Sequence, residues 1–353
     1  MRGAEALSGT KGFGMTGIRQ LDYLESNIRR KNAIKARAAY SVAAVACVVY
    51  FAIAYFLMRP IDSALLPLMQ RFASALTPDG KTAGELSAVF TEILEYVIIL
   101  ALPFGLAYVA YFFLHGRNPE PAVRHGAPRM PFLFIFGSIG ISYALNMLVN
   151  LIFGSAGERF RPEEEAPPET VPGIILYFIM ISVLPAILEE TAFRGIILKH
   201  LLPYGKTGAI VFSSLLFGLL HVSPTQAIFA FAFGIMLGLC YEYTRSIKFT
   251  ALIHFMNNLI SVALDYADRY GNPAVKVLST LYIYAMMGVG IFALVYYLRN
   301  GIKKQRVSFI RPEHIGAKLS FGRSMLHSLL NGGTIVLIAF YAFIIYVKYF
   351  GQK

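Results

Sequence analysis

The chain has 353 residues, of which 56% are hydrophobic and only 15% are charged. Soluble globular domains are about 45–50% apolar and about 25% charged, so this composition argues against a soluble protein. The formal net charge is +12. The basic excess lies beside apolar runs, which favours contact with a lipid bilayer over nucleic-acid binding.

The apolar runs predict an all-α integral membrane protein with about eight to nine transmembrane helices. Each long run approaches the roughly 20 residues that a helix needs to cross a ~30 Å hydrocarbon core. The first run ends at Arg59-Pro60 without a small-residue cleavage site, so we interpret it as a retained span and not as a signal peptide. The candidate spans are Ala38–Met58, Ile93–Leu114, Phe132–Phe153, Val171–Leu188, Gly208–Leu220, Thr225–Tyr241, Phe249–Leu264, Leu278–Leu298 and Thr334–Val347.

The spans and their connections divide the chain into four regions. In the first, Ile18–Arg37 could form a helix on the membrane surface or part of a solvated arm. The regions are a basic cytoplasmic arm (1–37), N-terminal helices with an acidic loop at Gly154–Thr170 (38–170), a core with charged residues inside its spans (171–265), and C-terminal helices with a basic cytoplasmic loop at Arg299–Gly333 (266–353).

The distribution of basic residues predicts the orientation. Of the 32 Lys and Arg residues, 23 fall on the same side of the predicted spans as the N-terminus. Because cytoplasmic loops are enriched in Lys and Arg, we expect a cytoplasmic N-terminus. We expect a multi-pass protein of the plasma membrane, with the lipid bilayer as a partner.

Charged residues interrupt the fourth apolar run, where charge is costly and usually functional. Glu190 and Arg194 are four residues apart, a spacing that favours an ion pair on a helix continuing from Pro172 to about Leu202. Glu189 points ~100° away round this helix, so we expect it to be free of that arginine. Pro185 removes a backbone donor one turn earlier and could kink the helix. The alternative is a buried structural pair or a helix end at the interface.

Three further polar residues lie in or at the end of apolar runs. His221 ends the fifth run, and an ordinary interfacial histidine is the alternative there. If that run extends outward from Gly208, helical rise puts His221 ~21 Å along it, deeper than Glu189 unless the span is tilted or starts above the membrane. In the seventh run His254 and Asn258 share a helix face. The alternative for this pair is hydrogen bonding between helices.

Together these residues suit hydrolysis. A carboxylate in a low-dielectric site can act as a general base, and a histidine can share a water molecule with it. A second histidine and an asparagine can donate hydrogen bonds to an oxyanion. The sequence has no HExxH zinc motif and no serine or cysteine in a recognisable nucleophile setting, and its two cysteines lie inside apolar runs.

The motifs EExxxR, FxxxH and HxxxN follow one another within residues 171–265. In this order they resemble the signature of the CAAX protease and bacteriocin-processing (CPBP or Abi) family. These glutamic intramembrane proteases include prenyl-protein endopeptidases of the Rce1 type. The resemblance implies that residues 171–265 form a catalytic intramembrane endopeptidase core whose site needs no metal or other cofactor and opens to the cytosol. It also implies a peptide or protein substrate, which in part of the family is prenylated or membrane-anchored.

The resemblance also implies a role for each motif residue. The roles are water activation by Glu189 and His221, oxyanion stabilisation by His254 and Asn258, and support by Glu190 and Arg194. Three other readings stay open at this point. One is a zinc-dependent hydrolase with Glu189, His221 and His254 as ligands. The others are a non-catalytic immunity or regulatory protein of the same fold, and a transporter, which the lack of an internal repeat disfavours.

Overall fold

The computed structural model describes residues 8–115, 130–158, 166–300 and 319–351. Throughout these ranges the regular structure is helical, with no strand. The elements are α1 (Ser8–Ala52), η1 (Ile53–Leu57), α2 (Met58–Leu76), α3 (Gly80–His115), α4 (Pro131–Glu158), α5 (Val171–Phe178), η2 (Ile179–Val183), α6 (Leu184–Glu190), η3 (Thr191–Leu198), α7 (Lys199–Leu201), η4 (Leu202–Tyr204), α8 (Lys206–Leu219), α9 (Pro224–Thr244), α10 (Ile247–Tyr270), α11 (Pro273–Asn300), α12 (Phe321–Leu329) and α13 (Gly332–Tyr349).

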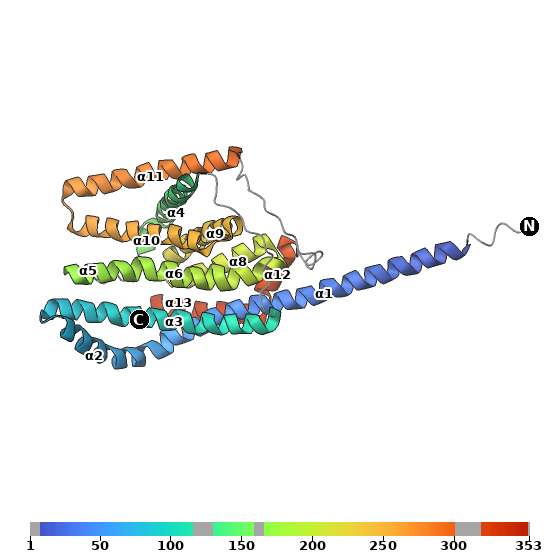
Figure 1. Ribbon diagram of the computed structural model, residues 1–353, viewed down its shortest axis with the longest axis horizontal. Helices are drawn as coiled ribbons and strands as arrows, with labels where there is room; N and C mark the ends of the chain where they lie inside the picture. Colours follow the sequence, from blue (N-terminus) through green and yellow to red (C-terminus); the bar gives the residue numbers. More distant parts are fainter. Residues whose placement is uncertain (1–7, 116–129, 159–165, 301–318, 352–353) are drawn as a thin grey trace, which may run out of the picture.

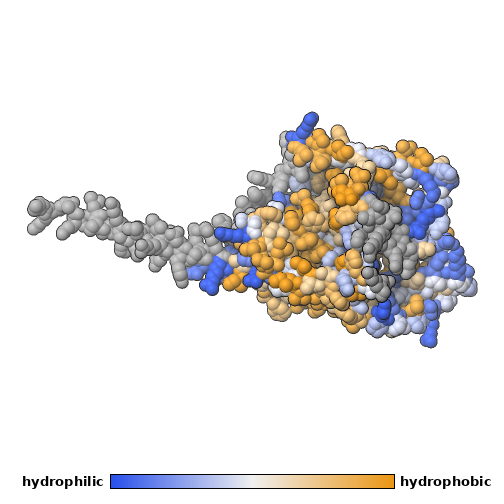
Figure 2. Space-filling model, turned by 180° about the vertical axis from the view of Figure 1, so that it is seen from behind, coloured by the Kyte–Doolittle hydropathy of each residue, from blue (hydrophilic) through white to orange (hydrophobic). Residues whose placement is uncertain are grey.

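Most of the helices run roughly along one direction, with α4 and α11 at one edge of the bundle and α2 and α3 at the opposite edge (Figure 1). Within the described residues, eight helical segments are long and apolar enough to cross a membrane. The surface of the bundle carries a broad area of apolar side chains (Figure 2), including many exposed Leu, Ile and Phe residues. Exposed apolar surface of this extent marks a membrane-facing region. The prediction of an all-α multi-pass membrane protein is therefore confirmed.

The fifth predicted span is shorter than a membrane crossing. It corresponds to α8, which has 14 residues. At 1.5 Å per residue α8 is about 21 Å long, less than a ~30 Å hydrocarbon core. It packs closely against α9. A Cβ on Gly218 would lie only 2.6 Å from the carbonyl oxygen of Ala227, so the close approach of these two helices requires a glycine there.

The structure differs from the sequence-based interpretation in the basic arm and in the segment between the first two predicted spans. α1 is one continuous helix, and its N-terminal part projects from the bundle as an extension of the span (Figure 1), so Ile18–Arg37 is not a separate surface helix. No Pro or Gly lies between Ile18 and Ala52 to break it. After a π-helical turn at η1, α2 lies between the first two predicted spans, where no helix was predicted. Pro60 falls in the first turn of α2, where proline is tolerated.

α2 folds back on α3, and the turn between them is ordered by a cap. Asp79 accepts hydrogen bonds from the hydroxyl and the backbone N–H of Thr82 at the start of α3. These bonds lower the pKa of the exposed Asp79 carboxyl, the hydroxyl contributing most.

Two expected loops are also more ordered than their composition indicated. Part of the acidic loop, residues 159–165, lies outside the described residues. Its end is held by Glu85 of α3, which accepts hydrogen bonds from the backbone N–H groups of Glu169 and Thr170. The expected basic loop contains α12, which packs on α8 and α1, with Ser324 and the Tyr40 hydroxyl 2.6 Å apart.

Candidate active site

The site is built around one helix, Val171–Tyr204, which contains α5, α6 and α7. It is continuous, as the sequence predicted. Two π-helical segments, η2 and η3, lie on either side of α6, which ends in Glu189 and Glu190. π-Helical turns inside α-helices are rare and frequently occur at functional sites. The backbone therefore departs from regular α-helix just before and just after the two carboxylates.

Glu190 and Arg194 form the ion pair that their spacing predicted. Arg194 Nη1 donates to Glu190 Oε1 at 2.7 Å, and both side chains are almost fully buried. Arg194 Nη2 donates to the carbonyl oxygen of Gly234 in α9 at 3.1 Å. The guanidinium carbon lies 4.8 Å from the centre of the Phe217 ring of α8. Arg194 thus ties the site helix to α8 and α9.

Arg194 pairs with Glu190, as expected, and Glu189 has partners on other helices. The hydroxyl of Tyr96 in α3 donates a hydrogen bond to Glu189 Oε1. The other oxygen, Oε2, lies 3.8 Å from Nε2 of His254, beyond hydrogen-bond range. Because its neighbours come from outside the site helix, helical spacing could not reveal them.

His254 lies between the two carboxylates. Its Nδ1 is 3.0 Å from Glu190 Oε1, and its Nε2 faces Glu189. An ionised carboxylate only accepts hydrogen bonds, so Nδ1 carries a proton and donates it to Glu190. The rings of Phe217 and Phe233 meet the imidazole edge to face. His254 is 4% exposed, so nearly all of its surroundings are protein.

His221 is adjacent to this cluster but does not bond to it directly. Its Nδ1 is 3.1 Å from the carbonyl oxygen of Phe217, which can only accept, so Nδ1 carries the proton. In the neutral ring Nε2 is then an acceptor. The ring of Phe217 lies next to both His221 and His254, with centroid distances of 5.4 and 6.0 Å.

The depth of His221 relative to Glu189 follows from the turn that connects the site helix to α8. The site helix ends at Tyr204 and α8 begins at Lys206, with Gly205 between them. Glu189 precedes Tyr204 by fifteen residues, and His221 follows Lys206 by fifteen residues. At 1.5 Å per residue Glu189 lies about 22 Å from this turn, and α8, about 21 Å long, ends two residues before His221. The two residues therefore lie at similar depth, and the discrepancy expected from the sequence disappears, because the site helix extends as far as the start of α8.

Asn258 is bonded to the backbone of the site helix. Its Nδ2 donates to the carbonyl oxygen of Ile181 at 3.1 Å. Pro185, four residues further on, has no N–H to donate to that carbonyl. Asn258 thus supplies the donor that the proline lacks. Its Oδ1 accepts from Asn257 Nδ2 at 3.3 Å, and Asn257 in turn accepts from Ser142 of α4 at 2.6 Å.

The structure brings most of the candidate residues together. Glu189, Glu190, Arg194 and His254 form one connected group, His221 lies next to it across Phe217, and Asn258 is one helical turn from His254. Tyr96 and Ser142 were missed, because nothing in the sequence distinguishes them from other tyrosines and serines. In the described part of the chain no three His, Cys, Asp or Glu side chains are placed to hold a metal ion.

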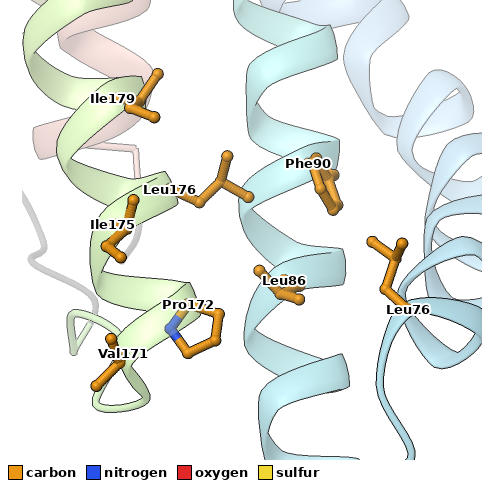
Figure 3. A pocket seen from close by; sticks show the side chains of 8 residues that line it. All are labelled: Leu76, Leu86, Phe90, Val171, Pro172, Ile175, Leu176 and Ile179. Atoms are coloured by element: carbon orange, nitrogen blue, oxygen red, sulfur yellow. The ribbon is translucent and has the colours of Figure 1, made fainter.

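A second feature of the site helix is an apolar groove of about 380 Å³ at its N-terminal end. Figure 3 shows the groove between α3 and α5, with Leu76 contributed from α2. Ile179, at its inner end, precedes Glu189 by ten residues, or about 15 Å of helix. No lining side chain is polar or titratable, so the groove offers no group for chemistry. The lining residues are Leu76, Leu86, Phe90, Val171, Pro172, Ile175, Leu176 and Ile179.

Comparison with known proteins finds a family match for the segment that carries the motifs. Residues 171–260 match the family described as type II CAAX prenyl endopeptidase Rce1-like. No curated protein and no solved structure matches the chain significantly. The matched segment runs from the first residue of α5 into α10 and contains the three motifs. Residues 171–260, which include both carboxylates, both histidines and Asn258, are therefore similar to the Rce1-like family of type II CAAX prenyl endopeptidases.

Proposed function

We propose that the chain is an intramembrane endopeptidase that hydrolyses a peptide bond with a water molecule activated by Glu189 and His221. The Rce1-like family is a family of proteases. The observation that carries the mechanism is the arrangement around Glu189. One of its oxygens is bonded to Tyr96, and the other faces His254 without a hydrogen bond to it. A carboxylate with one oxygen held and one available suits a general base.

His221 would act with Glu189 on the same water. Its Nδ1–H is bonded to the Phe217 carbonyl, so its Nε2 can accept a hydrogen bond from the water. Glu189 takes one proton, and the water oxygen attacks the peptide carbonyl carbon, whose oxygen becomes an oxyanion. When the C–N bond breaks, the leaving nitrogen takes the proton back from Glu189. The products are a carboxylic acid and an amine, and the enzyme is regenerated.

His254 would stabilise the oxyanion, and its contacts set a condition on its charge. Its Nδ1–H is bonded to Glu190, so a second donor at Nε2 requires the imidazolium form. That form balances the local charge, because two carboxylates would then face one guanidinium and one imidazolium. Asn258 can contribute through the second hydrogen of Nδ2, since the first is bonded to Ile181. Glu190 and Arg194 hold this arrangement in place.

The substrate class and orientation are part of the proposal. A peptide or protein anchored in the membrane, such as a prenylated one, would bring its scissile bond to the depth of Glu189. The excess of basic residues on the N-terminal side supports a cytoplasmic N-terminus. The proposal also includes a site open to the cytosol and a plasma-membrane location. The water is activated by side chains alone in this mechanism, without a metal.

The test is a comparison of protein termini in membranes that carry the wild type or Glu189→Gln. Glutamine keeps the acceptor for Tyr96 but cannot take a proton, so termini produced by the enzyme should disappear. The matched control is Glu85→Gln, which alters a carboxylate of α3 that holds the loop before α5 and lies outside the site. Termini that persist in Glu189→Gln membranes at the wild-type level would refute the proposed function.

A further inference from the structure

One hydrogen bond to Glu189, the proposed base, comes from outside the family segment. Tyr96 belongs to α3, whereas the matched segment begins at residue 171. Its hydroxyl donates to Glu189 Oε1, and its ring packs against the hydrophobic core of the bundle. α3 contacts both α6 and η3, so the tyrosine is presented by a helix that lies along the site helix. The hydroxyl therefore approaches Glu189 from a fixed direction.

The two oxygens of Glu189 have different surroundings. Oε1 is bonded to Tyr96, and Oε2 faces His254 at 3.8 Å. A carboxylate at the end of a glutamate side chain rotates easily about its last bond, for which rotamer preferences are broad. A hydrogen bond to one oxygen removes most of that freedom. The oxygen that remains is then directed toward the other groups of the site.

We propose that Tyr96 is a positioning residue for Glu189, which holds Oε1 so that Oε2 faces His254 and the reacting water. This inference rests on the proposed function. Tyr96 would not touch the substrate or transfer a proton. It acts by keeping the general base within the narrow geometry that proton transfer requires, where a displacement of about 1 Å can cost roughly 100-fold in rate.

The same helix supplies a matched control. Tyr111 of α3 is fully buried, and its hydroxyl donates to the carbonyl oxygen of Ala39 at 2.8 Å. It lies about four helical turns from Tyr96, and its ring stacks on the imidazole of His200. Tyr96→Phe and Tyr111→Phe each remove one hydrogen-bonded hydroxyl from α3. A purely structural role for Tyr96 predicts that the two variants behave alike.

The first experiment uses the full-length protein in detergent with a farnesylated peptide ending in a CAAX sequence, labelled on both sides of the scissile bond. For Tyr96→Phe we expect kcat to fall by about 10- to 100-fold with KM within about twofold of wild type. For Tyr111→Phe we expect kcat within about twofold of wild type. Both variants should lose some thermal stability. Equal kcat values for the two variants would overturn the proposal.

The second experiment needs no substrate, so it separates this inference from the proposed function. Dicyclohexylcarbodiimide modifies carboxyl groups in apolar surroundings, and mass spectrometry of the peptide that contains Glu189 measures the product. Glu189 should react at least several-fold faster in Tyr96→Phe than in wild type, because its Oε1 becomes free. Tyr111→Phe should react at the wild-type rate, and Glu189→Gln should show no product at that position.

The outcomes of the two experiments are distinguishable. If the wild type cuts no peptide but Tyr96→Phe speeds modification of Glu189, the contact stands and the CAAX substrate is wrong. If modification of Glu189 is equally fast in wild type and in Tyr96→Phe, the contact does not restrain the carboxylate. The positioning role is then refuted whether or not the protein cleaves peptides.

Discussion

Asn258 gives a test of how the site helix accommodates its proline. Pro185 has no N–H to donate to the carbonyl oxygen of Ile181 four residues before it, and Asn258 Nδ2 donates to that oxygen at 3.1 Å. Asn258→Ala should therefore destabilise the protein. Pro185→Ala restores a backbone N–H that can bond to the same carbonyl. In a Pro185→Ala background, the asparagine should matter less to stability.

The magnitude follows from the two hydrogen bonds that Asn258 makes. It donates to Ile181, and it accepts from Asn257 at 3.3 Å. Hydrogen bonds between transmembrane helices contribute on average about 0.6 kcal/mol and at most about 1.7 kcal/mol in double-mutant cycles. We expect Asn258→Ala to cost about 1–2 kcal/mol with Pro185 present. Only the bond to Ile181 can be replaced, so the cost should fall by about 0.6–1.7 kcal/mol when Pro185 is alanine.

The measurement is a double-mutant cycle of unfolding free energies. SDS titrated into detergent micelles unfolds the protein, and circular dichroism follows the loss of helix, since the chain contains no Trp for fluorescence. Pro103→Ala is the control, because this proline also lies inside a membrane helix, α3, without a bond to Asn258. An equal cost of Asn258→Ala in the wild-type and Pro185→Ala backgrounds would refute the reasoning. Cleavage should stay low in the double variant, because the amide for the oxyanion is still missing.

Three other predictions test the electrostatics, the metal requirement and the orientation. Glu190→Gln should lower the unfolding free energy by about 3–5 kcal/mol, because Arg194 is left buried and unpaired, and adding Arg194→Met should recover part of it. A Glu190→Gln variant as stable as wild type would contradict this. Cleavage should survive chelation, and a loss that Zn²⁺ restores would favour a metal site. In intact cells an impermeant maleimide should label Pro78→Cys but not Lys35→Cys, with the two natural cysteines buried, and the reverse pattern would invert the orientation.

Sequence reasoning succeeded where one helix fixes the geometry. The spacing of Glu190 and Arg194 predicted their ion pair, and the length of the apolar run predicted a helix that continues to about Leu202. In a helix, positions three or four residues apart must be neighbours, so no tertiary information is needed. The same holds for the family motifs, which are local patterns. Their roles in catalysis are still predictions that the variants above would test.

Sequence spacing could not predict contacts between helices that are far apart in the sequence. Tyr96 is one of 21 tyrosines, and its reach to Glu189 depends on how α3 packs against α6. The depth of His221 depended on where two neighbouring helices end, since the turn at Gly205 sets both. Likewise α12 lies in the segment interpreted as a basic loop, and α2 lies between the first two predicted spans, where no helix was predicted. Packing against α3 and α8 stabilises helices that sequence alone did not identify.

The candidate site therefore includes residues from both sides of residue 170, the boundary predicted between the N-terminal helices and the core. The family segment supplies the motif residues, but Glu189 is bonded to α3 and Asn257 to α4. The bond from α3 restrains Oε1 of Glu189, the proposed base. The bond from α4 restrains Asn257, which donates to Asn258, and Asn258 donates to the Ile181 carbonyl. Because both bonds come from helices outside the match, another chain could keep every motif and still position its base differently. Differences among such proteins in rate or substrate would then reside in α3 and α4 as much as in the motifs.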